Sequence, residues 1–129
     1  MNKISKLPAI PLITHDPFFS IWASGIAPTS DYTRHWSGVE KFLRGMLTVD
    51  GTQVRFLGRA GRPSMKCVDT EITPLSTCYV FEDMGVRLTL RFTSPLLMQD
   101  LEILSVPVSY VEFRLEFMDG KPHEVRLEF

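Results

Sequence analysis

LRGMLTVDGTQVRFL, residues 43–57, is the stretch of the sequence that most clearly specifies a backbone conformation. Two apolar runs, 43–49 and 53–57, flank the pair Asp50-Gly51. Asp and Gly tolerate the positive φ angles of a type I′ turn, and the pair is the strongest short-range signal for a hairpin. The stretch therefore predicts two antiparallel strands joined by a tight turn.

Further strands are predicted downstream of this hairpin. Residues 65–72 and 75–82 form two apolar runs separated by Thr73-Pro74. A turn at 83–85 leads into residues 86–92, where Val, Leu, Leu and Phe alternate with Arg, Thr and Arg. That alternation is typical of a half-buried strand with one wet face.

The last third of the chain carries two more alternating runs. Residues 110–117 and 124–129 flank Asp119-Gly120, and the pattern predicts a second hairpin whose opposite charges pair across the strands. Residues 96–104 have helical spacing of leucines, but Pro95 and Pro107 leave room only for a short turn or an irregular strand.

Upstream of the first hairpin, prolines hold residues 8–14 extended, which predicts an edge segment. Residues 18–23 follow as a strand that starts after Pro17. Residues 25–40 form a loop too long for a tight hairpin, and long ordered loops are often functional.

Seven to nine short strands, with at most one short helical turn, predict an all-β protein built as an antiparallel β-sandwich. A chain of 129 residues suits a single domain, residues 1–129. Because the apolar alternation is still running at Phe129, we expect the chain to be the N-terminal part of a longer multidomain protein. Its last strand would then be an exposed edge that promotes homodimers in isolation.

Charge and composition exclude several classes of partner. The formal net charge of −1 gives no field to attract nucleic acid or an anionic membrane. No apolar run approaches a membrane span and no signal peptide is visible, so we expect a cytoplasmic protein as written, or a secreted or periplasmic one if the sequence is trimmed. Cys67 and Cys78 lack zinc-site spacing and are interpreted as buried apolar side chains, with a disulfide between neighbouring strands as the alternative.

The first candidate site is His15-Asp16, before Pro17. The pair could supply a general base with a carboxylate partner, or two metal ligands. Adjacent residues of an extended chain point to opposite faces, however, so the two cannot simply pair with each other. The other interpretations are that Asp16 caps the turn while His15 hydrogen-bonds a neighbouring loop, or that the pair lies at a domain interface.

The second candidate site contains Asp31, Arg34, His35 and Trp36. Arg binds carboxylates with a forked geometry, and Trp stacks on sugars or anchors interfaces. An internal Asp31–Arg34 ion pair, with Trp36 filling the core, accounts for the same residues. The sequence has no Gly-x-Ser-x-Gly motif and no phosphate-binding loop. We therefore predict no catalytic residue, no metal and no cofactor in this chain.

Five segments together carry a family resemblance. They are LPAIPLITHDPFFSIW, DYTRHWSG, LRGMLTVDGTQVRFLG, EITPLSTCYVFEDMGVRLTLRFTSPLL and DLEILSVPVSYVEF. In this order they resemble the N-terminal region of the glutaminase A family, large microbial proteins that hydrolyse L-glutamine to L-glutamate and ammonia. The resemblance covers residues 7–129.

The resemblance implies a β-sandwich followed by a helical (α/α) toroid, similar to those of some glycoside hydrolases, that carries the acid-base chemistry. It implies that this chain, inactive alone, packs against the toroid and adds loop residues to its rim. The alternative function is a carbohydrate-binding module, which requires Trp36 and Tyr110 to be exposed and coplanar.

Overall fold

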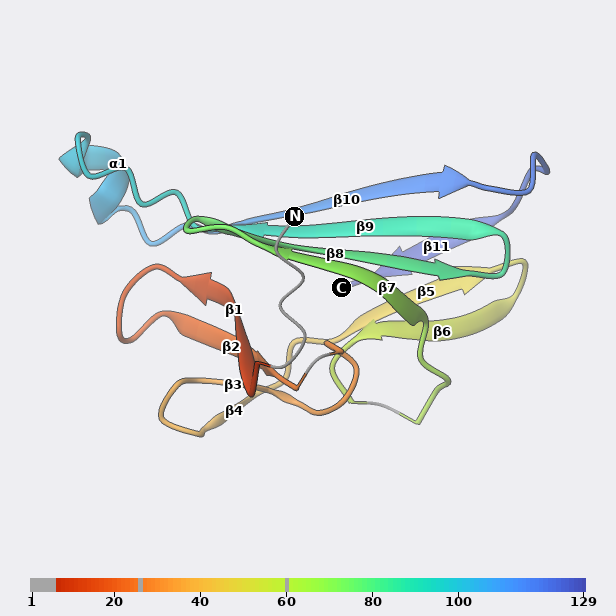
Figure 1. Cartoon of the computed structure of the whole chain (residues 1–129), viewed down its shortest axis with the longest axis horizontal. Coiled ribbons are helices and arrows are strands. Elements are labelled where there is room, and N and C mark those ends of the chain that lie inside the picture. The colour runs from red at the N-terminus through yellow and green to blue at the C-terminus, as the bar shows by residue number, and fades with distance from the viewer. Residues whose placement is uncertain (1–6, 26, 60) are drawn as a thin grey trace.

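The computed structural model describes residues 7–25, 27–59 and 61–129, and within them the chain is almost entirely β-structure (Figure 1). Eleven strands and one short helix are found in this described part. In chain order they are β1 (Ala9–Thr14), β2 (Ser20–Ser24), β3 (Thr33–Arg34), β4 (Glu40–Lys41), β5 (Gly45–Val49), β6 (Thr52–Leu57), β7 (Lys66–Ile72), β8 (Ser76–Asp83), β9 (Val86–Thr93), α1 (Leu101–Ser105), β10 (Tyr110–Phe117) and β11 (Val125–Glu128).

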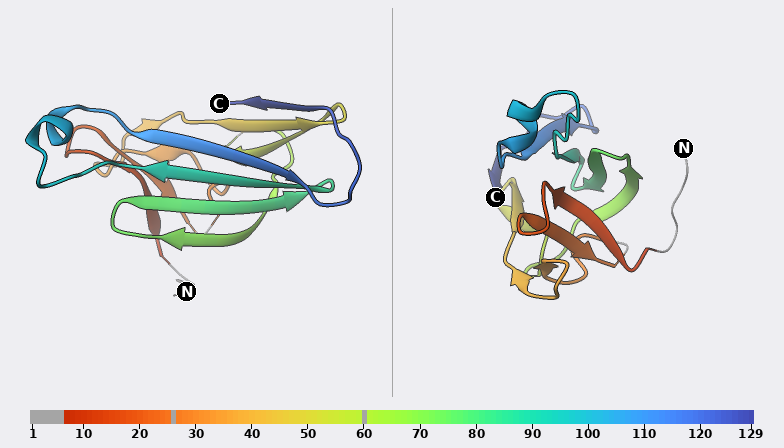
Figure 2. Two further views of the ribbon diagram at one scale, coloured as in Figure 1. Left: turned by 90° about the horizontal axis from the view of Figure 1, so that it is seen from above. Right: turned by 90° about the vertical axis from the view of Figure 1, so that its left-hand side faces the viewer.

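The strands form three antiparallel sheets in two layers (Figures 1 and 2). One layer is the four-stranded sheet β10-β9-β8-β7. The other contains the sheets β1-β2-β3-β4 and β11-β5-β6. The predicted all-β antiparallel fold with a single short helical turn is confirmed. The predicted count of seven to nine strands omitted β3 and β4, because two-residue strands inside a loop leave no periodic pattern in the sequence.

The hydrophobic core lies between the layers. Phe56 of β6 packs against Phe81 of β8, with ring centroids 6.1 Å apart, and both side chains are fully buried. The Tyr79 hydroxyl is also buried and has no hydrogen-bond partner in the described part; burial raises the pKa of Tyr79. Side chains from both layers complete the cluster: Ile10, Leu12, Ala23, Leu47, Val49, Val54, Leu57, Met65, Val86, Leu88, Leu90 and Phe92.

Two tight turns have the positive φ angles that the Asp50-Gly51 pair predicts for a type I′ turn. Asp50 and Gly51 have φ angles of 48° and 84°, and Val49 pairs directly with Thr52. Met84 and Gly85 have φ angles of 48° and 74° between β8 and β9. Positive φ at both central residues defines the type I′ turn, so the β5–β6 hairpin is confirmed.

The predicted hairpin between residues 110–117 and 124–129 is wrong. β10 pairs with β9, whereas β11 crosses to the other layer and pairs with β5, at the edge of that sheet. The charged side chains therefore pair within their own strands, Arg114 with Glu116 at 3.3 Å and Arg126 with Glu128 at 3.1 Å. The alternation alone could not distinguish the two partners, because either pairing buries the same face.

His123 anchors this crossover through both ring nitrogens. Nδ1 lies 2.6 Å from the Asp50 carboxylate, and Nε2 lies 2.9 Å from the Asp119 carboxylate. Asp50 also accepts a hydrogen bond from the Glu124 backbone N–H at 2.9 Å. The two carboxylates raise the pKa of His123, and the hydrogen bonds with His123 lower the pKa values of Asp50 and Asp119. We call these three side chains the imidazole clamp.

Three smaller predictions have clear outcomes. The second strand begins at Ser20 rather than at residue 18, because Phe18 and Phe19 belong to the turn before it. Cys78 is buried and Cys67 half-buried, and both are free, so the disulfide alternative is wrong. The segment 8–14 is an edge strand as predicted. Within the described ranges, the structure contains no helix with the length and apolar character needed to cross a bilayer.

Replacing Gly45 by Ala should destabilise the fold. A Cβ at Gly45 would overlap the ring of Phe56, which is fully buried and cannot move aside. We expect Gly45→Ala to lower the free energy of unfolding by about 2 kcal/mol, in the range of overpacked cores. Gly61→Ala is the matched control, because a Cβ there meets nothing within 4 Å. Equal urea midpoints for the two variants would contradict the packing described.

The imidazole clamp should make stability depend on pH. The raised pKa of His123 adds stability that is complete below its ordinary value, about 6.5, and is lost as the pH rises through the folded-state pKa. The lowered pKa values of Asp50 and Asp119 add stability that is complete above about pH 4 and is lost in acid. Urea midpoints should therefore fall between about pH 6 and pH 9. His123→Gln should lose most of this slope; an unchanged slope would refute the clamp.

Candidate functional site

The two clusters predicted from the sequence meet at one backbone carbonyl. His35 Nε2 lies 2.8 Å from the Pro17 carbonyl oxygen, and the Trp36 indole N–H donates to the same oxygen at 2.7 Å. The β1–β2 loop is thereby fixed against the β3–β4 loop. The two candidate sites therefore lie beside each other at Pro17.

Asp16 stabilises the β1–β2 loop from within. Its Oδ1 accepts hydrogen bonds from the backbone N–H groups of Phe18 and Phe19 at 2.7 and 2.8 Å, and these bonds lower the pKa of Asp16. The predicted turn cap is confirmed. The predicted hydrogen bond from His15 to a neighbouring loop is not found: in the described part Nδ1 is buried without a partner, and the ring packs at 6.1 Å from Phe19.

His35 is oriented by contacts of its ring with Ser37 and Pro17. Its Nδ1 accepts from the Ser37 backbone N–H at 3.2 Å and lies 2.7 Å from the Ser37 hydroxyl, which assigns the proton to Nε2 and to the bond with Pro17. Both ring nitrogens are therefore engaged. His35 holds the loops together and offers no free nitrogen to act as a general base.

Arg34 is neutralised inside the same loop. Its Nη2 lies 3.4 Å from Asp31 and 3.1 Å from Glu40. A backbone hydrogen bond from Tyr32 is the main reason that the pKa of Asp31 is lowered, and Arg34 adds to it. The predicted Asp31–Arg34 pair is confirmed, and it leaves Arg34 without a free fork for a ligand carboxylate.

One of the two interpretations predicted that Trp36 fills the core, and this is wrong. Its side chain is 64% exposed, because the indole N–H reaches out to Pro17 while the ring faces solvent. Phe18, on the opposite side of the same contact, is 92% exposed. The structure thus presents two aromatic rings on loops that are held in place by hydrogen bonds.

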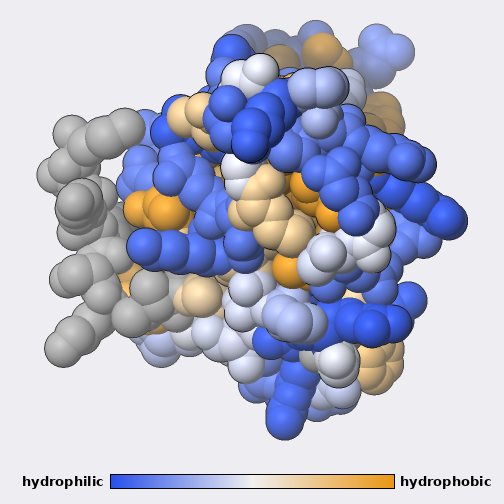
Figure 3. Space-filling model, turned by 90° about the vertical axis from the view of Figure 1, so that its right-hand side faces the viewer, coloured by the Kyte–Doolittle hydropathy of each residue, from blue (hydrophilic) through white to orange (hydrophobic). Residues whose placement is uncertain are grey.

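Further apolar side chains are exposed at the same end of the sandwich. α1 has no buried residue, although it includes Leu101 and Ile103, and its N-terminus is capped by Asp100. α1 and the β1–β2 and β3–β4 loops lie together at this end (Figures 1 and 2). We call Phe18, Trp36, Val39, Met98 and Leu101 the apolar end. The opposite end, with the tight turns, is mainly hydrophilic (Figure 3).

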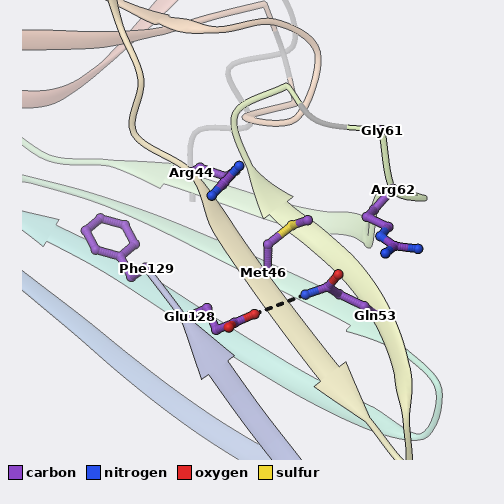
Figure 4. A pocket seen from close by; sticks show the side chains of 7 residues that line it. All are labelled: Arg44, Met46, Gln53, Gly61, Arg62, Glu128 and Phe129. Carbon is purple, nitrogen blue, oxygen red and sulfur yellow. Dashed lines mark hydrogen bonds between the residues drawn. The ribbon is translucent and has the colours of Figure 1, made fainter.

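A second surface was missed by sequence reasoning. Two adjoining hollows of about 430 and 670 Å³ share the side chains of Arg44 and Phe129. Figure 4 shows the residues that line the first of them. Phe129 comes beside Arg44 only because β11 pairs with β5. We call the combined surface the arginine groove; it is lined by Tyr32, Phe42, Leu43, Arg44, Met46, Gln53, Arg59, Gly61, Arg62, Glu128 and Phe129.

The described part offers no metal-ligating constellation: no group of three or more His, Cys, Asp or Glu side chains is placed to hold an ion. The nearest approach is the imidazole clamp, where both nitrogens of His123 are already bonded to carboxylates on opposite sides of the ring.

Comparisons with known proteins give two family models and one relative. A model described as a domain of unknown function, DUF4964, matches residues 2–68, and another, DUF5127, matches residues 75–128. Glutaminase A from Aspergillus oryzae (strain ATCC 42149 / RIB 40) is 27% identical over 133 residues, which cover 95% of this chain and 19% of the relative. The chain thus spans about a fifth of that relative's length. No solved structure matches the chain.

Removing the Asp16 cap should release the β1–β2 loop without unfolding the sandwich. In Asp16→Ala the N–H groups of Phe18 and Phe19 lose their acceptor. We expect their amide hydrogen exchange to accelerate by about tenfold or more, while amides of β8 and β9 keep their rates. Asp16→Asn retains a side-chain oxygen and should stay near the wild-type rate. Equal exchange in both variants would show that the cap does not order the loop.

Proposed function

Because the chain belongs to the family described as domain of unknown function DUF4964 and is related to the N-terminal region of glutaminase A, we propose that it is an accessory β-sandwich domain of a longer glutaminase-A-like hydrolase. Its apolar end packs against a helical (α/α) toroid domain of the same protein. The toroid carries the hydrolysis of L-glutamine to L-glutamate and ammonia, and this chain supplies rim contacts and no catalytic group.

The observation that carries the proposal is the combination of exposure and order at the Pro17 contact. Phe18 and Trp36 are among the most exposed large apolar side chains, yet Asp16, His35 and the Trp36 indole itself fix the loops that present them. Aromatic anchors that are ordered before binding lose little conformational entropy in a complex. Exposed apolar clusters of this kind are rare on monomers and mark interaction sites.

The chemistry of the predicted site residues supports a contact role over a catalytic one. Each ring nitrogen of His35 is bonded, and Arg34 is paired with two carboxylates. A general base needs a free lone pair within reach of its proton, and an oxyanion or carboxylate site needs free donors. The ring nitrogens of His35 and the guanidinium of Arg34 are instead engaged in contacts that hold the loops.

Carbohydrate binding is the second candidate. Trp36 and Tyr110 are both exposed, and exposed aromatic faces could stack on sugar rings. Quenching of tryptophan fluorescence by oligosaccharides, lost in Trp36→Ala, would favour this role over domain packing.

Oxidative labelling of methionines tests the packing proposal with a pair of residues of the same type. Met98 at the apolar end is 79% exposed, and Met118 at the hydrophilic end is 52% exposed. In the protein encoded by the complete reading frame, we expect Met98 to be oxidised at least about fivefold more slowly than in the isolated chain, because an interface core excludes solvent. Met118 should react equally in both.

Three results would contradict the proposal. They are a reading frame that stops after Phe129, equal oxidation of Met98 in the complete protein and in the isolated chain, and saturable glutamine hydrolysis by the isolated chain. The last would place the reaction in the sandwich itself.

A further inference from the structure

We propose that the arginine groove is a second docking surface, which binds a carboxylate-bearing face of the rest of the longer protein. The inference rests on the proposed function for the existence of that neighbour, but it concerns different residues and a different interaction. The apolar end excludes water from a hydrophobic contact, whereas the groove recognises negative charge and sets the orientation of the two domains.

The first support is that the groove's positive charge is not compensated from within. In the described part of the chain, no ion pair involves Arg44, Arg59 or Arg62. Arg59 lies near enough to Asp31 to help lower its pKa, but the Asp31 carboxylate is bonded to Arg34 and Tyr32. This contrasts with Arg34, which two carboxylates neutralise.

The one carboxylate that lines the groove is also engaged elsewhere. Glu128 accepts a hydrogen bond from the Gln53 amide at 3.0 Å, drawn in Figure 4, and pairs with Arg126 at 3.1 Å. Gln53 and Glu128 thus hold β6 and β11 together across β5 on the outer face of the sheet. Arg44 and Arg62 line the same hollow, and no carboxylate of the described residues pairs with either of them.

The side chains between the arginines are those of a protein interface. Phe42 is 74% exposed and meets Tyr32 edge to face, with ring centroids 5.5 Å apart; Phe129 is also exposed. Arg, aromatic residues and Met are the types enriched in interface cores. The two hollows share Arg44 and Phe129, so they form one continuous surface. Phe42 follows Val39 of the apolar end by three residues, so one neighbour can reach both surfaces.

A second copy of this chain is a poor occupant. In a two-fold dimer formed through the groove, the same three arginines would face each other. Like charges brought together across an interface cost several kcal/mol. The occupant must instead carry the opposite charge.

Modification of arginines by phenylglyoxal tests the inference on the complete protein and on the isolated chain. Arg91 is the control, because it is exposed on β9, outside the groove, and has no ion pair in the described part. We expect Arg44, Arg59 and Arg62 to react at least about fivefold more slowly in the complete protein, since a desolvated guanidinium paired with a carboxylate is inaccessible. Arg91 should react equally. About 0.5 M NaCl should restore the reactivity of Arg59 while Met98 stays protected from oxidation, because salt screens charge pairs.

A charge reversal gives an independent measurement. Arg62 is exposed and forms no ion pair within the described part of the chain, so the sandwich should remain folded in Arg62→Glu. We expect it to raise the reactivity of Arg59 in the complete protein by at least about threefold, because an acidic partner is repelled. Arg91→Glu should leave Arg59 unchanged.

The outcomes separate the two proposals. Protected Met98 with groove arginines as reactive as Arg91 overturns the inference and leaves the packing proposal standing. Unprotected Met98 overturns the proposed function together with the inference. Arginines that are protected in the isolated chain at high concentration, with a dimer by light scattering, would identify a second copy as the occupant and refute an acidic domain face.

Discussion

The contact of Phe56 with the opposite layer is the interaction on which the rest of the structure depends. Its ring packs 6.1 Å from Phe81 and 6.0 Å from Phe113, and it occupies the space left by the missing side chain of Gly45. Burying one such side chain contributes about 2 to 3 kcal/mol. Because β5, β6, β8 and β10 all meet at this ring, it fixes the spacing of the two layers and, through them, the positions of the loops.

The loops use polar contacts for order and keep their apolar groups outside. In a chain stabilised only by its own core, burial of the side chains of Phe18, Trp36 and Leu101 would lower the free energy of the folded state. Here the hydrogen bonds to Pro17 and Asp16, and the Asp100 cap of α1, stabilise the outward arrangement instead. These local hydrogen bonds hold apolar side chains in solvent-exposed positions. This is the physical reason for interpreting that end as an interface.

Features that depend on contacts between residues close together in the sequence could be predicted, and features that depend on distant contacts could not. The Asp50-Gly51 turn, the alternation of β9 and the Asp16 cap are decided by neighbouring residues, and each was predictable. The partner of β11 is decided by residues more than seventy positions apart, where the Asp50–His123 contact competes with a local hairpin. The sequence left the place of Trp36 open between the core and the surface, because the hydrogen bond to Pro17 that decides it crosses nineteen positions. The arginine groove has no local signature, because it exists only once β11 lies beside β5.

The two matched family segments share one sheet and one hydrophobic core. The first segment ends at residue 68, inside β7, and the second begins at residue 75, yet β7 pairs with β8 from Lys66↔Glu82 to Ile72↔Thr77, and buried residues of both segments share one core. A strand cut from its ladder exposes unpaired backbone groups, and half of a core cannot offset the entropy of ordering the chain. We therefore expect the segments to fold together. Such a unit holds an apolar surface and a charged surface at fixed positions; in the arrangement that we propose, the first supplies affinity and the second selects the orientation of the neighbour.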